Sequence, residues 1–128
     1  MKGLNSFAKE IHKNNCEKGF YEDKKEIGTM LMLCVSEMAE ALEADRKKRY
    51  CDLSDKEIKG FLDTEYTSKS FFQSVFQKHV KDTFEDEIAD TFIRLFDLAG
   101  YLNINIEWHI EQKLKYNKTR EKKHGKSY

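Results

Sequence analysis

The chain has 128 residues, of which 39% are hydrophobic and 36% are charged, and 23 basic side chains balance 23 acidic ones. This composition is too apolar for a disordered chain and too polar for a membrane protein, and the neutral balance provides no overall field that attracts nucleic acid. We therefore expect one folded cytoplasmic domain that has no membrane contact and no stable binding to nucleic acid.

Proline is absent from the sequence and glycine occurs six times. Helix breakers are therefore scarce, and so are the turn residues that connect strands. We expect an all-α fold, a bundle of four main helices with a short helical insert between the second and the third. Residues 1–121 would form the domain, with the insert at about 50–80, and residues 122–128 would form a basic polar tail.

The first two predicted helices follow from apolar residues at helical spacing. The first helix runs from Leu4 to about residue 17, and Gly19 stops it. The second helix runs from about residue 26 to about residue 48. Its buried stripe is expected to comprise Leu31, Val35, Met38 and Leu42.

The remaining helices are predicted in the same way. Within the insert, Ser54 and Glu57 have the spacing of a capping box, and a group of aromatic residues near residue 72 suggests a short helix. The third main helix begins near Lys81 and ends at Gly100 as its C-cap. Its expected apolar face comprises Phe84, Ile88, Phe92, Leu95 and Ala99. A fourth helix starts after Asn103 or Asn105 and directs Ile106, Ile110 and Leu114 to the core.

Two carboxylate pairs, Glu37 with Glu40 and Glu87 with Asp90, lie on the second and third predicted helices. Each pair occupies one side of its helix beside an apolar stripe, where unpaired like charges are destabilising. A divalent cation would offset this repulsion, and ligands that are all oxygen favour magnesium, with manganese as a substitute. Either pair alone is better explained as a solvated acidic face. Two pairs on neighbouring helices favour a metal site.

Lys113, Asn117 and Arg120 would share one face of the fourth helix. A guanidinium group can bind phosphate through two hydrogen bonds, and an ammonium group and an amide add a charge and a neutral donor. The dipole of a helix also favours cations in a solvated last turn. Both explanations of this row stay open.

Near the N-terminus, His12, Asn15 and Phe20 offer polar groups and a flat ring. A nucleobase requires both, because it stacks on aromatic rings and has donors and acceptors along its edge. The alternatives are core packing of Phe20 and a surface histidine with a local partner. Tyr21 is read as a packing residue.

Together these motifs resemble those of the MazG-like all-α nucleoside triphosphate pyrophosphatases. The matching stretches are SEMAEALE at 36–43, EDEIAD at 85–90 and KLKYNKTR at 113–120. They reproduce, in order, the family's E-x-x-E, E-x-x-D and K-x-x-x-N-x-x-R motifs. The N-terminal segment around His12 and Phe20 is similar to the family's base-binding region. The insert is a departure, because the two acidic motifs lie closer together in compact members.

The resemblance implies a magnesium-dependent enzyme that converts a (deoxy)nucleoside triphosphate to the monophosphate and pyrophosphate, in nucleotide-pool house-cleaning, as a homodimer or a dimer of dimers. It assigns metal binding and catalysis to Glu37, Glu40, Glu87 and Asp90. It assigns phosphate binding to Lys113, Asn117 and Arg120, and base or sugar binding to His12, Asn15 and Phe20. Two alternatives stay open: a phosphoribosyl-ATP pyrophosphohydrolase, and a non-catalytic helical dimerisation protein.

Overall fold

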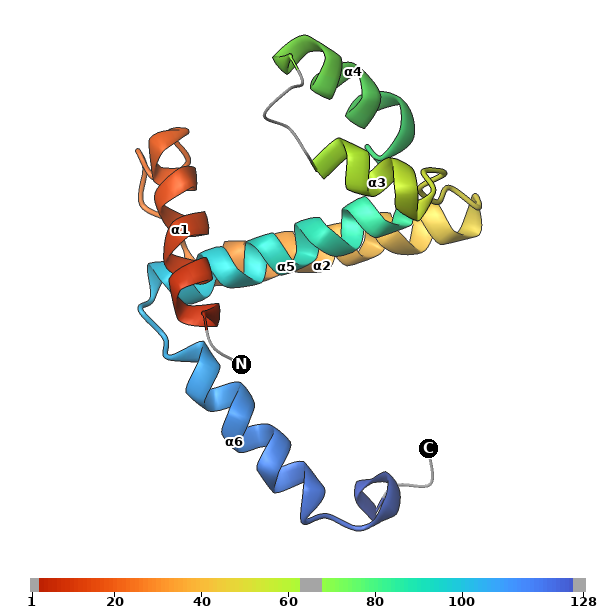
Figure 1. The fold of residues 1–128 in the computed structure, drawn as a ribbon. Helices are drawn as coiled ribbons and strands as arrows, with labels where there is room; N and C mark the ends of the chain where they lie inside the picture. Colours follow the sequence, from red (N-terminus) through yellow and green to blue (C-terminus); the bar gives the residue numbers. More distant parts are fainter. Residues whose placement is uncertain (1–2, 63–67, 126–128) are drawn as a thin grey trace. The chain divides into compact units, whose positions relative to one another are not determined.

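A computed structural model describes residues 3–62 and 68–125 (Figure 1). Its helices are α1 (Leu4–Glu17), α2 (Ile27–Arg46), α3 (Asp55–Leu62), α4 (Lys69–His79), α5 (Phe84–Tyr101) and α6 (Ile106–Lys118), followed by the short 3-10 helix η2 (Lys122–Gly125). The described residues contain no strand, so the all-α prediction is confirmed. None of the described helices combines the length and the apolarity that a membrane crossing requires. Residues 63–67 of the predicted insert and 126–128 of the predicted tail lie outside the described residues.

The chain forms two compact units. The carboxylate unit is Gly28–Arg94, and the terminal unit combines Met1–Ile27 with Leu95–Tyr128. Most of α5 belongs to the carboxylate unit and its last residues to the terminal unit. The predicted boundary between domain and tail, at residue 121, stays a prediction.

In the carboxylate unit, α2 and α5 run side by side in opposite directions (Figure 1). The backbone N–H of Phe84, at the start of α5, donates to the carbonyl of Arg49, just beyond the end of α2, at 2.9 Å. Farther along the pair, Arg94 of α5 binds Glu37 of α2. The chain between these helices contains α3 and α4, and the capping box is confirmed, because Ser54 and Glu57 exchange hydrogen bonds of 2.6 and 3.2 Å. Two short helices are therefore present in the segment predicted to contain them, and its status as an insert stays a prediction.

The predicted buried stripe of α2 is wrong. Its four members, which we call the α2 stripe, are between 45% and 49% exposed: Leu31, Val35, Met38 and Leu42. The buried positions of α2 are instead Met30, Cys34, Glu37, Ala41 and Ala44. Apolar residues occupy more than one side of this helix, so periodicity cannot select the inner side, whereas close helix packing favours the small residues.

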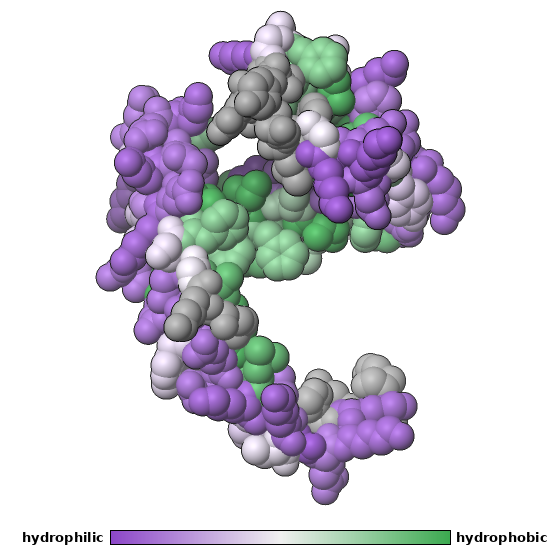
Figure 2. All heavy atoms as spheres, viewed as in Figure 1, coloured by the Kyte–Doolittle hydropathy of each residue, from purple (hydrophilic) through white to green (hydrophobic). Residues whose placement is uncertain are grey.

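Hydrophobic residues gather on the exposed surface where α2 and α5 lie (Figure 2). On α5, the predicted face is wrong at Phe92 and Leu95, which are exposed, whereas Ala99 is buried as expected. The buried positions of α5 within the carboxylate unit are polar, Glu87 and Thr91, and Thr83, just before the helix, is buried as well. In the carboxylate unit, these two helices therefore bury mostly small or polar side chains and leave large apolar ones exposed.

In the terminal unit, α1 packs closely against the end of α5. A Cβ atom placed on Gly100 would lie 2.5 Å from the carbonyl oxygen of Ala8 and 2.8 Å from the Cβ of His12. Gly100 is therefore a packing residue, and the prediction that it caps α5 is wrong. The helix continues to Tyr101, and Asn103 adopts the left-handed conformation with φ of 52°. Asparagine tolerates that conformation, so the turn does not require glycine.

Helix α6, also in the terminal unit, begins directly after Asn105, one of the two asparagines predicted to precede it. The side chain of Asn105 accepts a hydrogen bond from the backbone N–H of Trp108 at 3.2 Å. The backbone N–H of Leu4 donates to the side chain of Glu107 at 2.9 Å, which joins α1 to α6. Leu114 is 51% exposed, so its predicted place in the core is wrong.

Replacing Gly100 by alanine is expected to destabilise the protein by about 1–3 kcal/mol, because α1 has to move away from the new methyl group. The gain in helix propensity, about 1 kcal/mol, offsets only part of this cost. Gly28 provides the matched control, since no atom lies within 4 Å of a Cβ added there. Urea unfolding measures both variants, and equal stabilities for Gly100→Ala and Gly28→Ala would contradict the packing role.

Candidate metal centre

Three of the four predicted carboxylates lie together in the carboxylate unit. One oxygen each from Glu37, Glu87 and Asp90 lies within 4.8 Å of the others. Glu37 and Glu87 are buried, at 8% and 6% exposure, and Asp90 is half-buried. Glu40 is exposed, but a hydrogen bond joins its side chain to Glu87. The spacing within each motif and the antiparallel packing of α2 and α5 thus bring all four carboxylates to one place.

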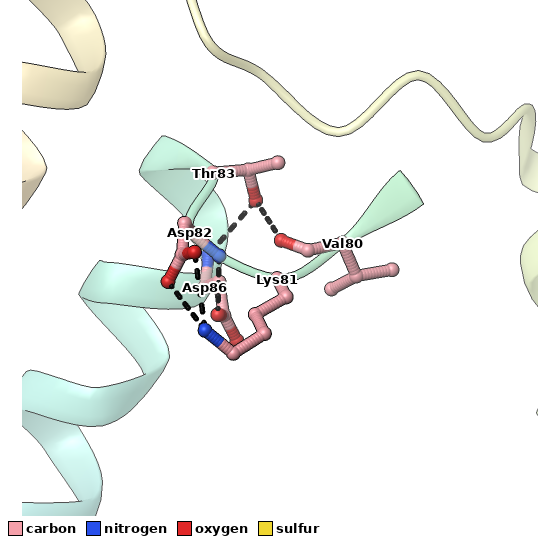
Figure 3. A network of polar contacts seen from close by, with 5 residues as sticks. All are labelled: Val80, Lys81, Asp82, Thr83 and Asp86. Atoms are coloured by element: carbon pink, nitrogen blue, oxygen red, sulfur yellow. Dashed lines mark hydrogen bonds and ion pairs between the residues drawn. The ribbon is translucent and has the colours of Figure 1, made fainter. Parts of the chain in front are cut away.

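The register of α5 depends on the turn that precedes it (Figure 3). The hydroxyl of Thr83 donates to the carbonyl of Val80 at 2.6 Å and accepts from the backbone N–H of Asp86 at 3.3 Å. The carboxylate of Asp86 accepts from the backbone N–H of Asp82 at 2.9 Å. Side chains therefore satisfy the free N–H groups at the start of the helix. Glu87 stands one turn later, and its backbone N–H donates to the carbonyl of Thr83 at 3.0 Å.

The mutual repulsion of the carboxylates changes their protonation. Burial, followed by the charge and the hydrogen bond of Glu40, raises the pKa of Glu87 to about 7. Burial also raises the pKa of Asp90, and the negative charges of Asp86 and Glu37 add to this effect. A hydrogen bond between Glu40 and Glu87 requires a proton on one of the two carboxyl groups. Near neutral pH and without a bound cation, the cluster therefore keeps a proton, which lowers the repulsion between its carboxylates.

Arg94 is a member of this cluster that the sequence reasoning missed. Its Nε atom lies 2.5 Å from Oε1 of Glu37, and the two side chains are 39% and 10% exposed. Arg94 follows Asp90 by four residues and Glu87 by seven, so the spacing places it on the acidic face of α5 but does not pair it with Glu37. Its guanidinium lowers the pKa of Asp90, against the larger effects of burial and of the neighbouring carboxylates.

The chemistry of the four carboxylates fits a hard divalent cation. Carboxylate oxygens are the ligands that magnesium and manganese prefer, and two oxygens on one magnesium ion lie about 3–4 Å apart. The three oxygens of Glu37, Glu87 and Asp90, within 4.8 Å of one another, would need side-chain shifts of about 1 Å to meet that geometry. Glu40, whose side chain is hydrogen-bonded to Glu87, would complete the set.

The predicted phosphate-binding residues belong to the terminal unit. Lys113 and Asn117 lie on α6, whereas Arg120 follows the end of that helix, so the prediction of one continuous helical face is wrong at Arg120. The Nζ atom of Lys113 and the Cζ atom of Arg120 lie 5.2 and 5.7 Å from the ring centroid of Tyr116. This ring attracts both cations and holds them near each other.

The predicted base-binding residues also belong to the terminal unit. The Nδ1 atom of His12 lies 3.0 Å from one carboxylate oxygen of Asp97, and the hydroxyl of Tyr21 donates to the other at 2.7 Å. Burial, followed by the hydrogen bond to Asp97, raises the pKa of Tyr21. The ring of His12 therefore has a polar partner, as expected of the alternative in which this histidine is satisfied within the fold. The sequence reasoning missed Asp97, which is buried and seven residues beyond Asp90.

Phe20 is 59% exposed, so the alternative of core packing is wrong for this ring. It follows α1 in a turn in which Gly19 has a left-handed φ of 86°. The backbone N–H of Phe20 donates to the carbonyl of Asn15 at 3.1 Å. The backbone thus joins Phe20 to Asn15, and the ring is accessible for stacking.

Comparisons with protein-family models, with curated proteins and with solved structures found no match for this chain. The relation to the MazG-like pyrophosphatases stays a prediction that depends on the motifs and their order. The geometry of the carboxylates is therefore the main observation from which a function can be proposed.

Proposed function

We propose that this protein is a magnesium-dependent nucleoside triphosphate pyrophosphohydrolase related to the MazG-like enzymes. It would convert a (deoxy)nucleoside triphosphate to the monophosphate and pyrophosphate. The observation that supports the proposal is the convergence of Glu37, Glu87 and Asp90 from two antiparallel helices, with Glu40 bound to Glu87. The order of the acidic and basic motifs along the chain supports it further.

In this proposal, the four carboxylates would hold magnesium or manganese, which neutralises the triphosphate and lowers the pKa of the attacking water when bound. Glu40 is the exposed member of the four, so its carboxylate is accessible to the attacking water and could accept its proton. Lys113, Asn117 and Arg120 would bind phosphate oxygens. The base or sugar would contact His12, Asn15 and Phe20, with the exposed ring of Phe20 available for stacking.

The proposal is tested by screening the full chain against a nucleotide panel with magnesium, while pyrophosphate and phosphate are measured separately. We expect pyrophosphate without phosphate from at least one (deoxy)nucleoside triphosphate. Turnover of phosphoribosyl-ATP alone would favour the phosphoribosyl-ATP pyrophosphohydrolase. A folded protein that hydrolyses no nucleotide of the panel would contradict the proposal and favour a non-catalytic helical dimer.

We further propose that a second copy of this chain covers the α2 stripe. Soluble monomers rarely leave large contiguous apolar surfaces exposed, and the same stripe in another copy is a chemically matching surface for a two-fold contact. Light scattering over a range of concentrations is expected to give the mass of a dimer or of a dimer of dimers. A fully active protein that remained monomeric throughout would contradict this interface.

A further inference from the structure

The ion pair between Arg94 and Glu37 uses one of the carboxylates that the proposed function assigns to the metal ion. Glu37 is paired with the guanidinium and is also one of the three carboxylates that lie within 4.8 Å of one another, so Arg94 and a divalent cation would compete for the charge of the same carboxylate. A divalent ion carries twice the charge of the guanidinium, and three further carboxylates attract it. The cation would therefore compete successfully for Glu37 and separate it from Arg94.

After this exchange, Arg94 would have a free guanidinium beside the site. Its side chain is already 39% exposed, so it can turn toward a ligand without unfolding α5. A phosphate group on the bound cation would be the nearest new anion, and a guanidinium binds phosphate more strongly than a neutral donor does. The exchange thus converts an internal counter-ion into a substrate contact.

On the basis of the proposed function, we propose that Arg94 is a positioning residue that holds Glu37 in the metal-free protein, gives it up to the divalent cation, and then binds a phosphate group of the substrate. An ion pair that only stabilised the fold would give different results in measurements of stability and of metal affinity. It would stabilise the protein equally with and without metal, and its removal would leave the affinity for metal unchanged.

The test uses the full chain and measures Mn²⁺ binding by calorimetry for the wild type, Arg94→Gln and Arg94→Lys. Arg94→Gln is expected to bind Mn²⁺ about twofold to tenfold more tightly, because the competing cation is gone. Its melting temperature should fall without Mn²⁺ and approach that of the wild type with saturating Mn²⁺. Arg94→Lys keeps the charge, so its affinity for Mn²⁺ and its melting temperature should lie between those of the wild type and Arg94→Gln. It replaces Arg94→Gln in the test if that variant does not fold.

Lys81→Gln is the matched control for loss of one positive charge. Lys81 belongs to the same unit, and its charge interacts with that of Glu87. Its Nζ atom, however, pairs with Asp82 at 3.0 Å (Figure 3). Its removal should change the affinity for Mn²⁺ less than the removal of Arg94 does. Equal changes in the two variants would mean a general effect of charge and would overturn the exchange.

The phosphate contact is tested with inorganic triphosphate as the probe, at saturating Mn²⁺. Arg94→Gln is expected to bind it about tenfold more weakly than the wild type. Unchanged affinity for triphosphate would overturn the proposed phosphate contact, and unchanged affinity for Mn²⁺ would overturn the exchange at Glu37. A wild-type protein that binds no Mn²⁺ would instead overturn the proposed function itself, so the two failures are distinguishable.

Discussion

Replacing Glu40 by glutamine is expected to lower kcat/KM for the preferred triphosphate by about a thousandfold or more, with the fold intact. Glutamine has nearly the shape of glutamate, but it lacks the negative charge that a metal ligand requires and cannot accept the proton of the attacking water. Glu40 is exposed, and the amide of glutamine can still hydrogen-bond to Glu87, so the substitution leaves the buried Glu87 with a partner. Steady-state kinetics measure the effect, and circular dichroism monitors the helices.

Glu43→Gln provides the matched control for this prediction. Glu43 is on the same helix, three residues beyond Glu40, and it pairs with Lys47 at 3.2 Å, outside the carboxylate cluster. An exposed ion pair of this kind contributes little to stability, so we expect activity close to that of the wild type. Near-normal turnover by Glu40→Gln, or an equal loss in both variants, would contradict the role given to the cluster.

Without magnesium, the protein is expected to lose stability as the pH rises from about 5 to about 8, because the pKa of Glu87 rises from 4.5 to about 7 on folding. Between these two values, the folded protein holds a proton that the unfolded chain has lost. Protonation therefore stabilises the fold below pH 4.5, and this contribution is lost as the pH rises through about 7. The difference between the two pKa values corresponds to about 3 kcal/mol of stability between low and high pH.

Magnesium should reverse this loss at pH 8, where the carboxylates are free to bind it, and should have little effect at pH 5. Thermal melts at several pH values, with and without magnesium, measure both effects. Glu87→Gln imitates the protonated side chain, so its stability should vary less with pH and respond weakly to magnesium. Glu43→Gln is the control and should show the pH dependence and the magnesium response of the wild type. If Glu87→Gln shows them too, Glu87 is not the group responsible for the pH dependence.

Helix positions were predictable because their signals are local. The first helix was predicted at residues 4–17 and is observed at Leu4–Glu17, and the second was predicted two residues longer at its C-terminal end than observed. The capping box at Ser54 and Glu57 also formed as expected. Each of these signals operates within a few residues and does not depend on the rest of the fold.

The side of α2 that is buried was not predictable from its pattern of hydrophobic residues. Leu31 and Val35 have the spacing of a buried stripe, but Cys34 and Ala41 have it too, and the smaller residues are the buried ones. The choice depends on how closely the neighbouring helix approaches, which hydrophobic periodicity does not contain.

The carboxylate cluster was predictable for a different reason. A three-residue spacing on each of two helices leaves few arrangements once the helices pack antiparallel. The partners of the predicted site residues were not predictable, because Arg94 reaches Glu37 across 57 residues of sequence and Asp97 reaches His12 across 85. Such contacts depend on tertiary packing, and charge pattern alone gives no preference among the many cations and anions of this chain.

The buried side of α2 also determines how the chain reacts with thiol reagents. Cys34 is 3% exposed and its thiol donates to the carbonyl of Met30, whereas Cys16 is exposed, and both are free. Burial raises the pKa of the Cys34 thiol, which lowers its thiolate fraction as well as its accessibility. Alkylation of Cys34 therefore requires α2 to separate from its neighbours, whereas Cys16 reacts in the folded state. The ratio of the two labels reports the opening of the helix one turn from Glu37, without any introduced probe.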